Sequence, residues 1–202
     1  MATFRFFTLF FCCIIFLLFM QSCEPKAAST EQSAVTEERA ATNEVTKPTF
    51  ETPANFQSQF KEIWQAYLAI KDALVLSDPQ QTREKAGAFV AVLHQADTAL
   101  LESATKKMWI EREKSLANGA AAIKGGKTIG EQRAAFESLS EEIYGLVREV
   151  GASGTTVYKQ YCPMAFDSKG AFWLSADKEI KNPYFGDAML SCGQVQEELH
   201  FK

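Results

Sequence analysis

The sequence lacks the short motifs that mark the common enzyme classes. It contains no glycine-rich phosphate loop, no Gly-x-Ser-x-Gly elbow, no His-Glu-x-x-His and no Cys-x-x-Cys. Histidine is scarce, since only His94 and His200 are present. A nucleophile pair of Cys162 and His94 stays open as a third hypothesis, because such partners meet only in the folded chain. We expect the protein not to be an enzyme.

Basic clusters are absent as well. Lys and Arg number 21 against 25 Asp and Glu, and no basic block interrupts this mildly acidic balance. Nucleic acid is not an expected partner, because binding to its phosphates needs a basic surface. The same balance argues against docking on anionic lipid through the protein surface.

The one long hydrophobic run lies at the N-terminus. Residues 6–20 carry no charge and are almost entirely apolar, and Ser22-Cys23 follows shortly after them. These 15 residues are short for a membrane span, which needs about 20. The pattern is typical of a bacterial lipoprotein signal peptide over residues 1–22, with Cys23 lipidated and anchored to the membrane. An uncleaved anchor helix is the alternative, and both place the globular part outside the cytoplasm, with the periplasmic side expected.

Residues 23–51 are rich in Ala, Ser, Thr, Glu and Lys, with no aromatic residue before Phe50. A segment of this composition cannot bury enough apolar surface to offset the entropy lost on ordering. We expect a disordered tether here, followed by a single domain over residues 52–202.

Four apolar stripes at helical spacing follow the tether. The first begins near residues 52–55. The second follows Asp78-Pro79, where aspartate can cap the helix and proline suits its first turn. The third ends at Gly125-Gly126. Four amphipathic helices with short links predict a mainly α fold, an antiparallel four-helix bundle.

Two finer features of these helices can be predicted. The second stripe extends through Ala96, Leu100 and Leu101, so that only a slight break near residues 103–105 separates it from the third. At the start of the fourth, Thr128 and Glu131 match a capping box, in which each side chain satisfies a backbone N–H of the other residue.

After Gly154 the pattern changes to short strand-type runs. Strand-forming residues gather at 157–161, 172–173 and 194–201, and residues 182–186 have a turn-type sequence. The segment is too small to be expected to fold alone. We predict a small C-terminal β-rich segment packed on the bundle.

Cys162 and Cys192 are the only cysteines after residue 23, and each has a methionine nearby, Met164 and Met189. Thiolate and thioether sulfur select soft ions such as Cu(I) over hard cations. Outside the cytoplasm a lone cysteine pair also oxidises readily, and a disulfide closing a loop of about 30 residues stabilises by about 3 to 4 kcal/mol. A proline after Cys162 and a glycine after Cys192 would fix the turns in either case. The residues themselves leave both interpretations open.

The same stretch carries a resemblance to a known family. Its motifs are Tyr-x-x-Tyr-Cys-Pro-Met-Ala at 158–165, Asn-Pro-Tyr-Phe-Gly-x-Ala-Met-Leu-x-Cys-Gly at 182–193, and upstream Gln-Arg-x-Ala-Phe at 132–136. They resemble an uncharacterised bacterial envelope domain, found as stand-alone lipoproteins and as a C-terminal extension of periplasmic adaptor subunits of copper and silver efflux pumps. The resemblance covers Phe56 to about Leu199. It implies a role in heavy-metal handling, with efflux-pump or other envelope proteins as partners.

A second, local resemblance is to a short heavy-metal-binding module with Cys-Pro-Met-His and a later Cys-Gly-Met. Here Ala165 stands in place of that histidine and Gln194 in place of that methionine. His94 and Met108 are outside candidates from the helices. By these resemblances the expected ligands of Cu(I) or Ag(I) are four sulfur-bearing side chains: Cys162, Met164, Met189 and Cys192.

Two hypotheses of function follow. The first is a membrane-tethered envelope protein that binds Cu(I) or Ag(I) and holds or hands over the ion. The second is a disulfide-stapled structural or interaction module of an envelope assembly, which needs no metal and no other cofactor.

Overall fold

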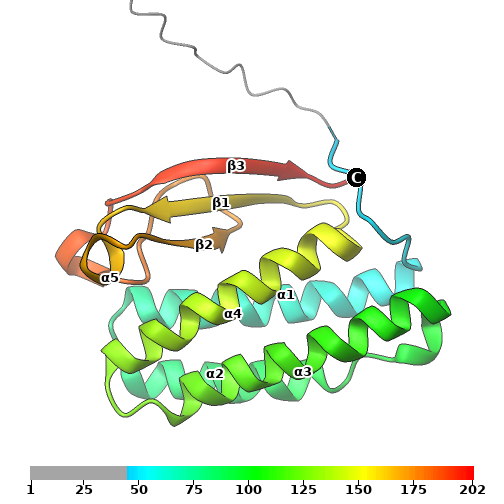
Figure 1. The fold of residues 1–202 in the computed structure, drawn as a ribbon, viewed down its shortest axis with the longest axis horizontal. Coiled ribbons are helices and arrows are strands. Elements are labelled where there is room, and N and C mark those ends of the chain that lie inside the picture. Colours follow the sequence, from blue (N-terminus) through cyan, green and yellow to red (C-terminus); the bar gives the residue numbers. More distant parts are fainter. Residues whose placement is uncertain (1–44) are drawn as a thin grey trace, which may run out of the picture. The chain divides into compact units, whose positions relative to one another are not determined.

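A computed structural model describes residues 45–202 of the chain. The predicted signal peptide, the lipidation site Cys23 and most of the predicted tether lie outside the described residues. Residues 45–202 fall within one compact unit. In it, a sheet of three strands lies over four long helices (Figure 1).

The four long helices are α1 (Ala54–Val75), α2 (Pro79–Leu93), α3 (Ser103–Gly125) and α4 (Ile129–Val150). Each packs against the next, and α1 also contacts α4. Their apolar stripes meet in one core, whose largest fully buried side chains include Trp109, Phe56, Phe60, Phe89 and Phe136. The prediction of a mainly α fold is confirmed. Among the helices described, none combines the length and apolar character that a membrane span requires.

Two of the helices, α2 and α4, begin with the predicted capping residues, whereas Pro53 before α1 and Glu102 before α3 form no side-chain capping bond. Asp78 accepts a hydrogen bond from the N–H of Gln81 (2.9 Å), and Thr128 accepts one from the N–H of Glu131 (3.2 Å). The carboxylate of Glu131, however, accepts from the N–H of Lys127 (2.7 Å) instead of Thr128. The second half of the predicted capping box is therefore wrong, because the glutamate side chain reaches one residue further back.

The connection between α2 and α3 is longer than predicted. Residues 94–102 are not helical except for one 3-10 turn, η1 (Thr98–Leu100). Asp97 accepts a hydrogen bond from the N–H of Ala99 (2.9 Å), and its own N–H donates to the side chain of Gln59 on α1 (2.7 Å). Such local bonds compete with the helical ladder. The predicted continuation of α2 to residue 101 is therefore wrong.

The C-terminal segment forms an antiparallel sheet with strand order β2-β1-β3. β1 (Thr156–Cys162) is central, between β2 (Ala171–Ser175) and β3 (Gln194–His200). β2 packs against α4. The prediction of a small C-terminal sheet is confirmed.

A buried hydroxyl ties the sheet to the helices. Tyr67 of α1 is hydrogen-bonded to Ser140 of α4 (2.9 Å), and the backbone N–H of Leu174 in β2 donates to the same phenol oxygen (3.0 Å). Burial raises the pKa of Tyr67 well above its ordinary value. The hydroxyl therefore stays protonated and links three elements.

Residues 45–51 lie along the domain. The N–H of Thr46 donates to the carbonyl of His200 (2.7 Å), and the N–H of Phe50 donates to that of Glu149 (2.8 Å). Contacts with the domain thus begin before residue 52, the boundary predicted from the sequence.

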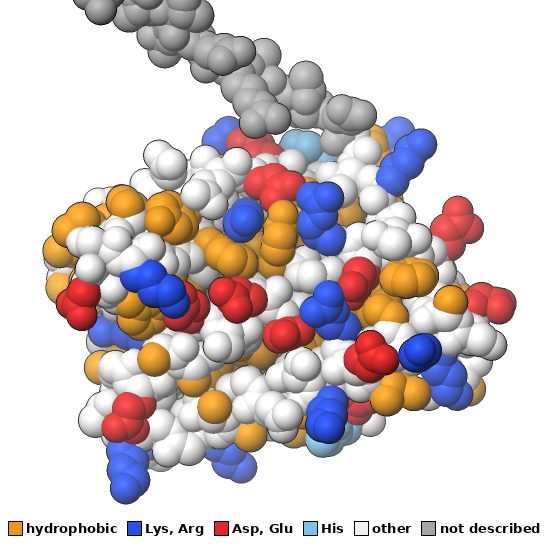
Figure 2. Space-filling model, viewed as in Figure 1, with side chains coloured by type: hydrophobic (Ala, Val, Ile, Leu, Met, Phe, Trp, Pro, Cys, Tyr) orange, Lys and Arg blue, Asp and Glu red, His pale blue; other side chains and the backbone are white. Residues whose placement is uncertain are grey.

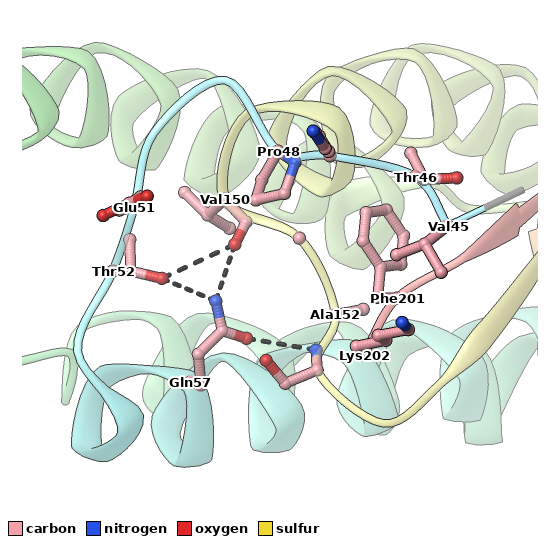
Figure 3. A pocket seen from close by; sticks show the side chains of 13 residues that line it. Val45, Thr46, Pro48, Glu51, Thr52, Gln57, Val150, Ala152, Phe201 and Lys202 are labelled. Carbon is pink, nitrogen blue, oxygen red and sulfur yellow. Dashed lines mark hydrogen bonds between the residues drawn. The ribbon is translucent and has the colours of Figure 1, made fainter.

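A cavity of about 350 Å³ lies between this N-terminal segment, the end of α4 and the end of β3 (Figure 3). Pro48, Val150 and Phe201 are among its lining residues. Gln57 also lines the cavity, and its side-chain amide donates to the carbonyl of Val150 (2.6 Å) and accepts from the N–H of Ser153 (3.2 Å). Gln57 therefore joins segments of the protein, and we assign the cavity no ligand.

Candidate functional site

The two cysteines singled out by the sequence meet at one end of the sheet. Cys162 is the last residue of β1 and is buried, whereas Cys192 is half-buried in the turn before β3. Their sulfur atoms lie 3.0 Å apart although 30 residues separate them in the chain. The pairing of β1 with β3 explains this approach: Tyr161 lies opposite Gln194, and the cysteines lie just beyond these two residues.

Gly193 lets the chain pass close to β1 directly after Cys192. Its φ of 146° favours glycine. A Cβ atom at this position would lie 2.9 Å from the carbonyl oxygen of Tyr161 and 3.1 Å from Cη2 of Trp173. A larger residue would therefore push the turn, and Cys192 with it, away from the sheet.

An aromatic cluster packs beside the sulfur pair. Trp173 is fully buried and its ring centroid lies 5.9 Å from that of Tyr184, which also packs against Phe166 at 5.2 Å. The hydroxyl of Tyr184 donates to the carbonyl of Phe172 (2.6 Å). Burial raises the pKa of Tyr184 well above its usual value. The cluster therefore adds uncharged aromatic packing to this part of the sheet.

The two methionines lie at the surface. Met164 precedes a short turn, α5 (Ala165–Ser168), and is 47% exposed; Met189 closes the 3-10 turn η2 (Gly186–Met189) and is 41% exposed. Together with Leu190 they contribute exposed hydrophobic side chains. Figure 2 shows hydrophobic surface gathered at the end of the molecule where α5 lies. The structure thus brings the two thiols together and leaves both thioethers largely open to solvent.

The turn α5 has left-handed backbone angles. Phe166, Asp167 and Ser168 have φ values of 52°, 55° and 69°, in a region that costs about 1–2 kcal/mol per non-glycine residue. Aspartate tolerates this region, but Phe166 and Ser168 give no sign of three such residues in a row, so the turn was not predicted from the sequence. Three consecutive residues of this kind immediately follow the Cys-Pro-Met-Ala motif, which marks this end of the sheet as a strained part of the chain.

The candidates from the helices are not near the sulfur pair. His94 directly follows the last residue of α2, and Met108 lies near the start of α3. The C-terminal end of α2 and the N-terminal end of α3 lie at the opposite end of the helices from α5 (Figure 1). His200 is hydrogen-bonded to Thr156 at the start of β1, whereas Cys162 ends that strand. A Cys162–His94 nucleophile pair is therefore not formed.

The contact between the sulfurs acts against ionisation. Hydrogen bonding with Cys162, aided by some burial, raises the pKa of the Cys192 thiol above its ordinary value. In the reduced protein the Cys192 thiol therefore holds its proton at neutral pH. Because a metal ion binds the thiolate, its binding here would release protons.

The donor set suits a soft ion. Within residues 45–202, no three or more His, Cys, Asp and Glu side chains group as ligands for a metal. The two thiols are thus the nucleus of any soft-metal site at this end, and further donors would have to be thioethers. Two thiolates at about 2.3 Å from a tetrahedral metal stand about 3.8 Å apart. Cys162 and Cys192 would therefore separate slightly to admit an ion.

The fold and this site define a mainly helical domain with a two-cysteine cluster on a small C-terminal sheet. Residues 63–155 match a family described as "Protein of unknown function (DUF3347)", so a DUF3347 domain is present there. The match runs from within α1 to the residue before β1 and ends ahead of both cysteines. No curated protein and no solved structure matches the chain. The prediction of an uncharacterised domain is thus supported for residues 63–155.

Proposed function

We propose that this protein is a membrane-tethered envelope protein that binds a soft heavy-metal ion, Cu(I) or Ag(I), in metal handling or efflux. Cys162 and Cys192 are the primary ligands, and Met164 and Met189 supply further sulfur. The observation that carries the proposal is the 3.0 Å contact between the two cysteine sulfurs. Cu(I) and Ag(I) prefer soft sulfur donors, and the two cysteine sulfurs place a pair of them together.

The site holds or hands over the ion and does not turn over a substrate. Neither histidine of the chain lies at the sulfur pair, so no imidazole base assists the thiols. Cys192 is only half-buried and Met164 and Met189 are exposed. A donor or acceptor site on another protein can therefore approach the ion and exchange ligands with it.

The setting of the site follows from the sequence. The apolar run over residues 6–20, with Cys23 shortly after it, supports a lipid anchor on the periplasmic side, and the predicted tether would connect that anchor to the domain. The four long helices would form an antiparallel four-helix bundle that carries the sulfur-bearing segment. The resemblance to domains attached to copper and silver efflux adaptors supports efflux-pump or other envelope proteins as partners.

A second candidate function rests on the same contact. Sulfurs only 3.0 Å apart need little movement to form a disulfide, and oxidising conditions outside the cytoplasm favour that bond. In this alternative the bridge staples the C-terminal turn to β1. The domain then serves as a structural or interaction module of an envelope assembly without a metal.

A Cu(I) titration against a chromophoric chelator separates the two candidates; it uses the reduced chain with Cys12, Cys13 and Cys23 replaced by serine, so that Cys162 and Cys192 are its only thiols. The metal-binding protein competes with the chelator for Cu(I), and Cys162→Ser abolishes the competition. His94→Asn is the matched control, because it removes a ligand-type side chain at the far end of the helices and leaves competition unchanged. A wild-type chain that fails to compete contradicts the proposal and favours the stapled module.

A further inference from the structure

The turn that presents Cys192 is organised by one fully buried asparagine, Asn182. Its side-chain Nδ2 donates to the carbonyl oxygen of Cys192 (2.8 Å), and its Oδ1 accepts from the N–H of Tyr184 (2.8 Å). Its backbone N–H donates to the carbonyl of Leu190 (2.9 Å), and its own carbonyl accepts from the N–H of Gly186 (3.0 Å). All four bonds close the segment 182–192 on itself.

Cys192 is held at both of its backbone polar groups. Its N–H donates to the carbonyl of Met189 (3.0 Å), and its carbonyl accepts from Asn182. Gly193 then passes too close to Tyr161 and Trp173 for a side chain to fit. The backbone of Cys192, and with it the direction of its Cα–Cβ bond, is therefore held on both sides of the residue.

The segment is also fastened to the helices. The guanidinium of Arg133 on α4 donates to the carbonyl of Pro183 (2.9 Å), to that of Leu74 (3.3 Å) and to the hydroxyl of Ser77 (2.9 Å). Gly186 packs so closely on the end of α1 that a Cβ atom at this position would clash with the Ser77 hydroxyl oxygen. Movement of the turn relative to the helices is thereby restricted.

We propose that Asn182 is the positioning residue of the sulfur pair: its amide holds the Cys192 backbone so that the Cys192 sulfur stays against that of Cys162. The inference rests on the proposed function in taking this pair as the working site. It goes further in naming a residue that touches neither the ion nor a sulfur atom. Asn182 sets the effective concentration of one thiol at the other, which governs both metal chelation and disulfide formation.

The test measures that effective concentration directly. The full chain is equilibrated with mixtures of reduced and oxidised glutathione under native conditions. Cys162 and Cys192 together lose two electrons and two protons to form one disulfide, and one glutathione disulfide is reduced to two glutathione thiols. Trapping with an alkylating reagent and mass analysis of the peptides that contain Cys162 and Cys192 give the fraction oxidised, independently of the other cysteines.

The variant Asn182→Asp keeps the acceptor for Tyr184 and removes the donor to Cys192. We expect the effective concentration to fall about tenfold, a factor that corresponds to about 1.4 kcal/mol. Leu116→Ala, a core change in α3 at a distance from the turn, is the control for a general loss of stability and leaves the value within about twofold of wild type, because independent sites act additively.

Two results would overturn the inference: an Asn182→Asp value equal to wild type, or an equal fall in Leu116→Ala. Both variants are compared where circular dichroism shows them folded, and a variant that fails this check is replaced by the milder Asn182→Ser or Ile123→Val. If wild-type protein shows no Cu(I) competition while Asn182→Asp still lowers the effective concentration, the proposed function fails and the positioning role stands.

Discussion

The position that a Cβ atom would take at Gly193 lies 3.1 Å from Cη2 of Trp173. The residue after Cys192 is therefore in contact with the indole of β2. The turn of Cys192 thus contacts a fully buried chromophore. Its packing can be tested by substitution at Gly193, and its movement by the fluorescence of Trp173.

Replacing Gly193 by alanine should displace the turn. The methyl group meets Tyr161 and Trp173, and the φ of 146° is unfavourable for alanine. We expect a loss of about 1–3 kcal/mol in the free energy of unfolding, in the range of backbone strain, measured by urea denaturation. Gly154→Ala, at a φ of 71° with no atom within 4 Å of the new Cβ, is the control for strain without a clash. Equal losses in the two variants would show that contact with Trp173 is unimportant.

Trp173 should report on the sulfur pair by fluorescence. Because the indole lies beside the residue after Cys192, opening the pair for an ion or closing it as a disulfide changes the surroundings of the ring. We expect a change in emission when reduced protein binds Ag(I), and its loss in Trp173→Phe. Trp109→Phe, which removes an indole from α3 within the helical core, should keep the signal. An Ag(I)-dependent change that survives Trp173→Phe would contradict this assignment.

Tyr67→Phe should loosen the sheet from the helices. The substitution leaves the buried N–H of Leu174 without its acceptor and Ser140 without its partner. An unpaired buried polar group costs about 1–3 kcal/mol, which thermal or urea unfolding can measure. Tyr144→Phe removes a hydroxyl that bonds Glu197 in a half-exposed position and should cost less. A larger loss in Tyr144→Phe would contradict the assigned role of Tyr67.

Cu(I) affinity should rise with pH. The pKa of Cys192 is raised by its hydrogen bond with Cys162, so below that pKa the ion must displace a proton from the thiol. For each proton released the apparent binding constant rises by about tenfold per pH unit, and the rise ends once pH exceeds the thiol pKa. Chelator competition at several pH values measures the slope. A pH-independent constant between neutral pH and the ordinary thiol pKa would show that the sulfurs are already ionised in the metal-free protein, contrary to the raised pKa of Cys192.

The same shift has a consequence for the stability of the reduced protein. A raised folded-state pKa means that the native state holds the Cys192 proton more tightly than the unfolded chain. The stabilisation is therefore fully present below the unfolded thiol pKa and is lost as pH rises through the folded one. Cys192→Ser, which cannot ionise in this range, should remove that part of the decline in unfolding free energy at alkaline pH.

The sequence predicts the helices well because their apolar side chains recur at helical spacing and the starts of α2 and α4 carry capping residues. Asp78 and Thr128 both cap as expected. The stripe through residue 101 misleads, because Asp97 forms local hydrogen bonds that end the helical course of the chain. The spacing of apolar residues alone cannot predict such local hydrogen bonds.

The candidate site is predictable only in part. The residue types single out Cys162 and Cys192, and strand pairing then brings them together. Asn182 looks like an ordinary turn residue in the sequence, since its hydrogen bonds are visible only once the segment has folded. In the left-handed turn after Met164 only Asp167 is of a residue type that tolerates such angles, which is too little to predict three of them in a row.

The chemical state of Cys162 and Cys192 in protein taken directly from the cell envelope tests the central claim most directly. Acid quenching, alkylation and peptide mass analysis would trap each cysteine as it exists in the cell. The account predicts that the two cysteines are recovered unlinked, as alkylated thiols once bound metal has been removed. Recovery of a disulfide-linked Cys162–Cys192 peptide in essentially all molecules would contradict a metal-binding role and leave the stapled module.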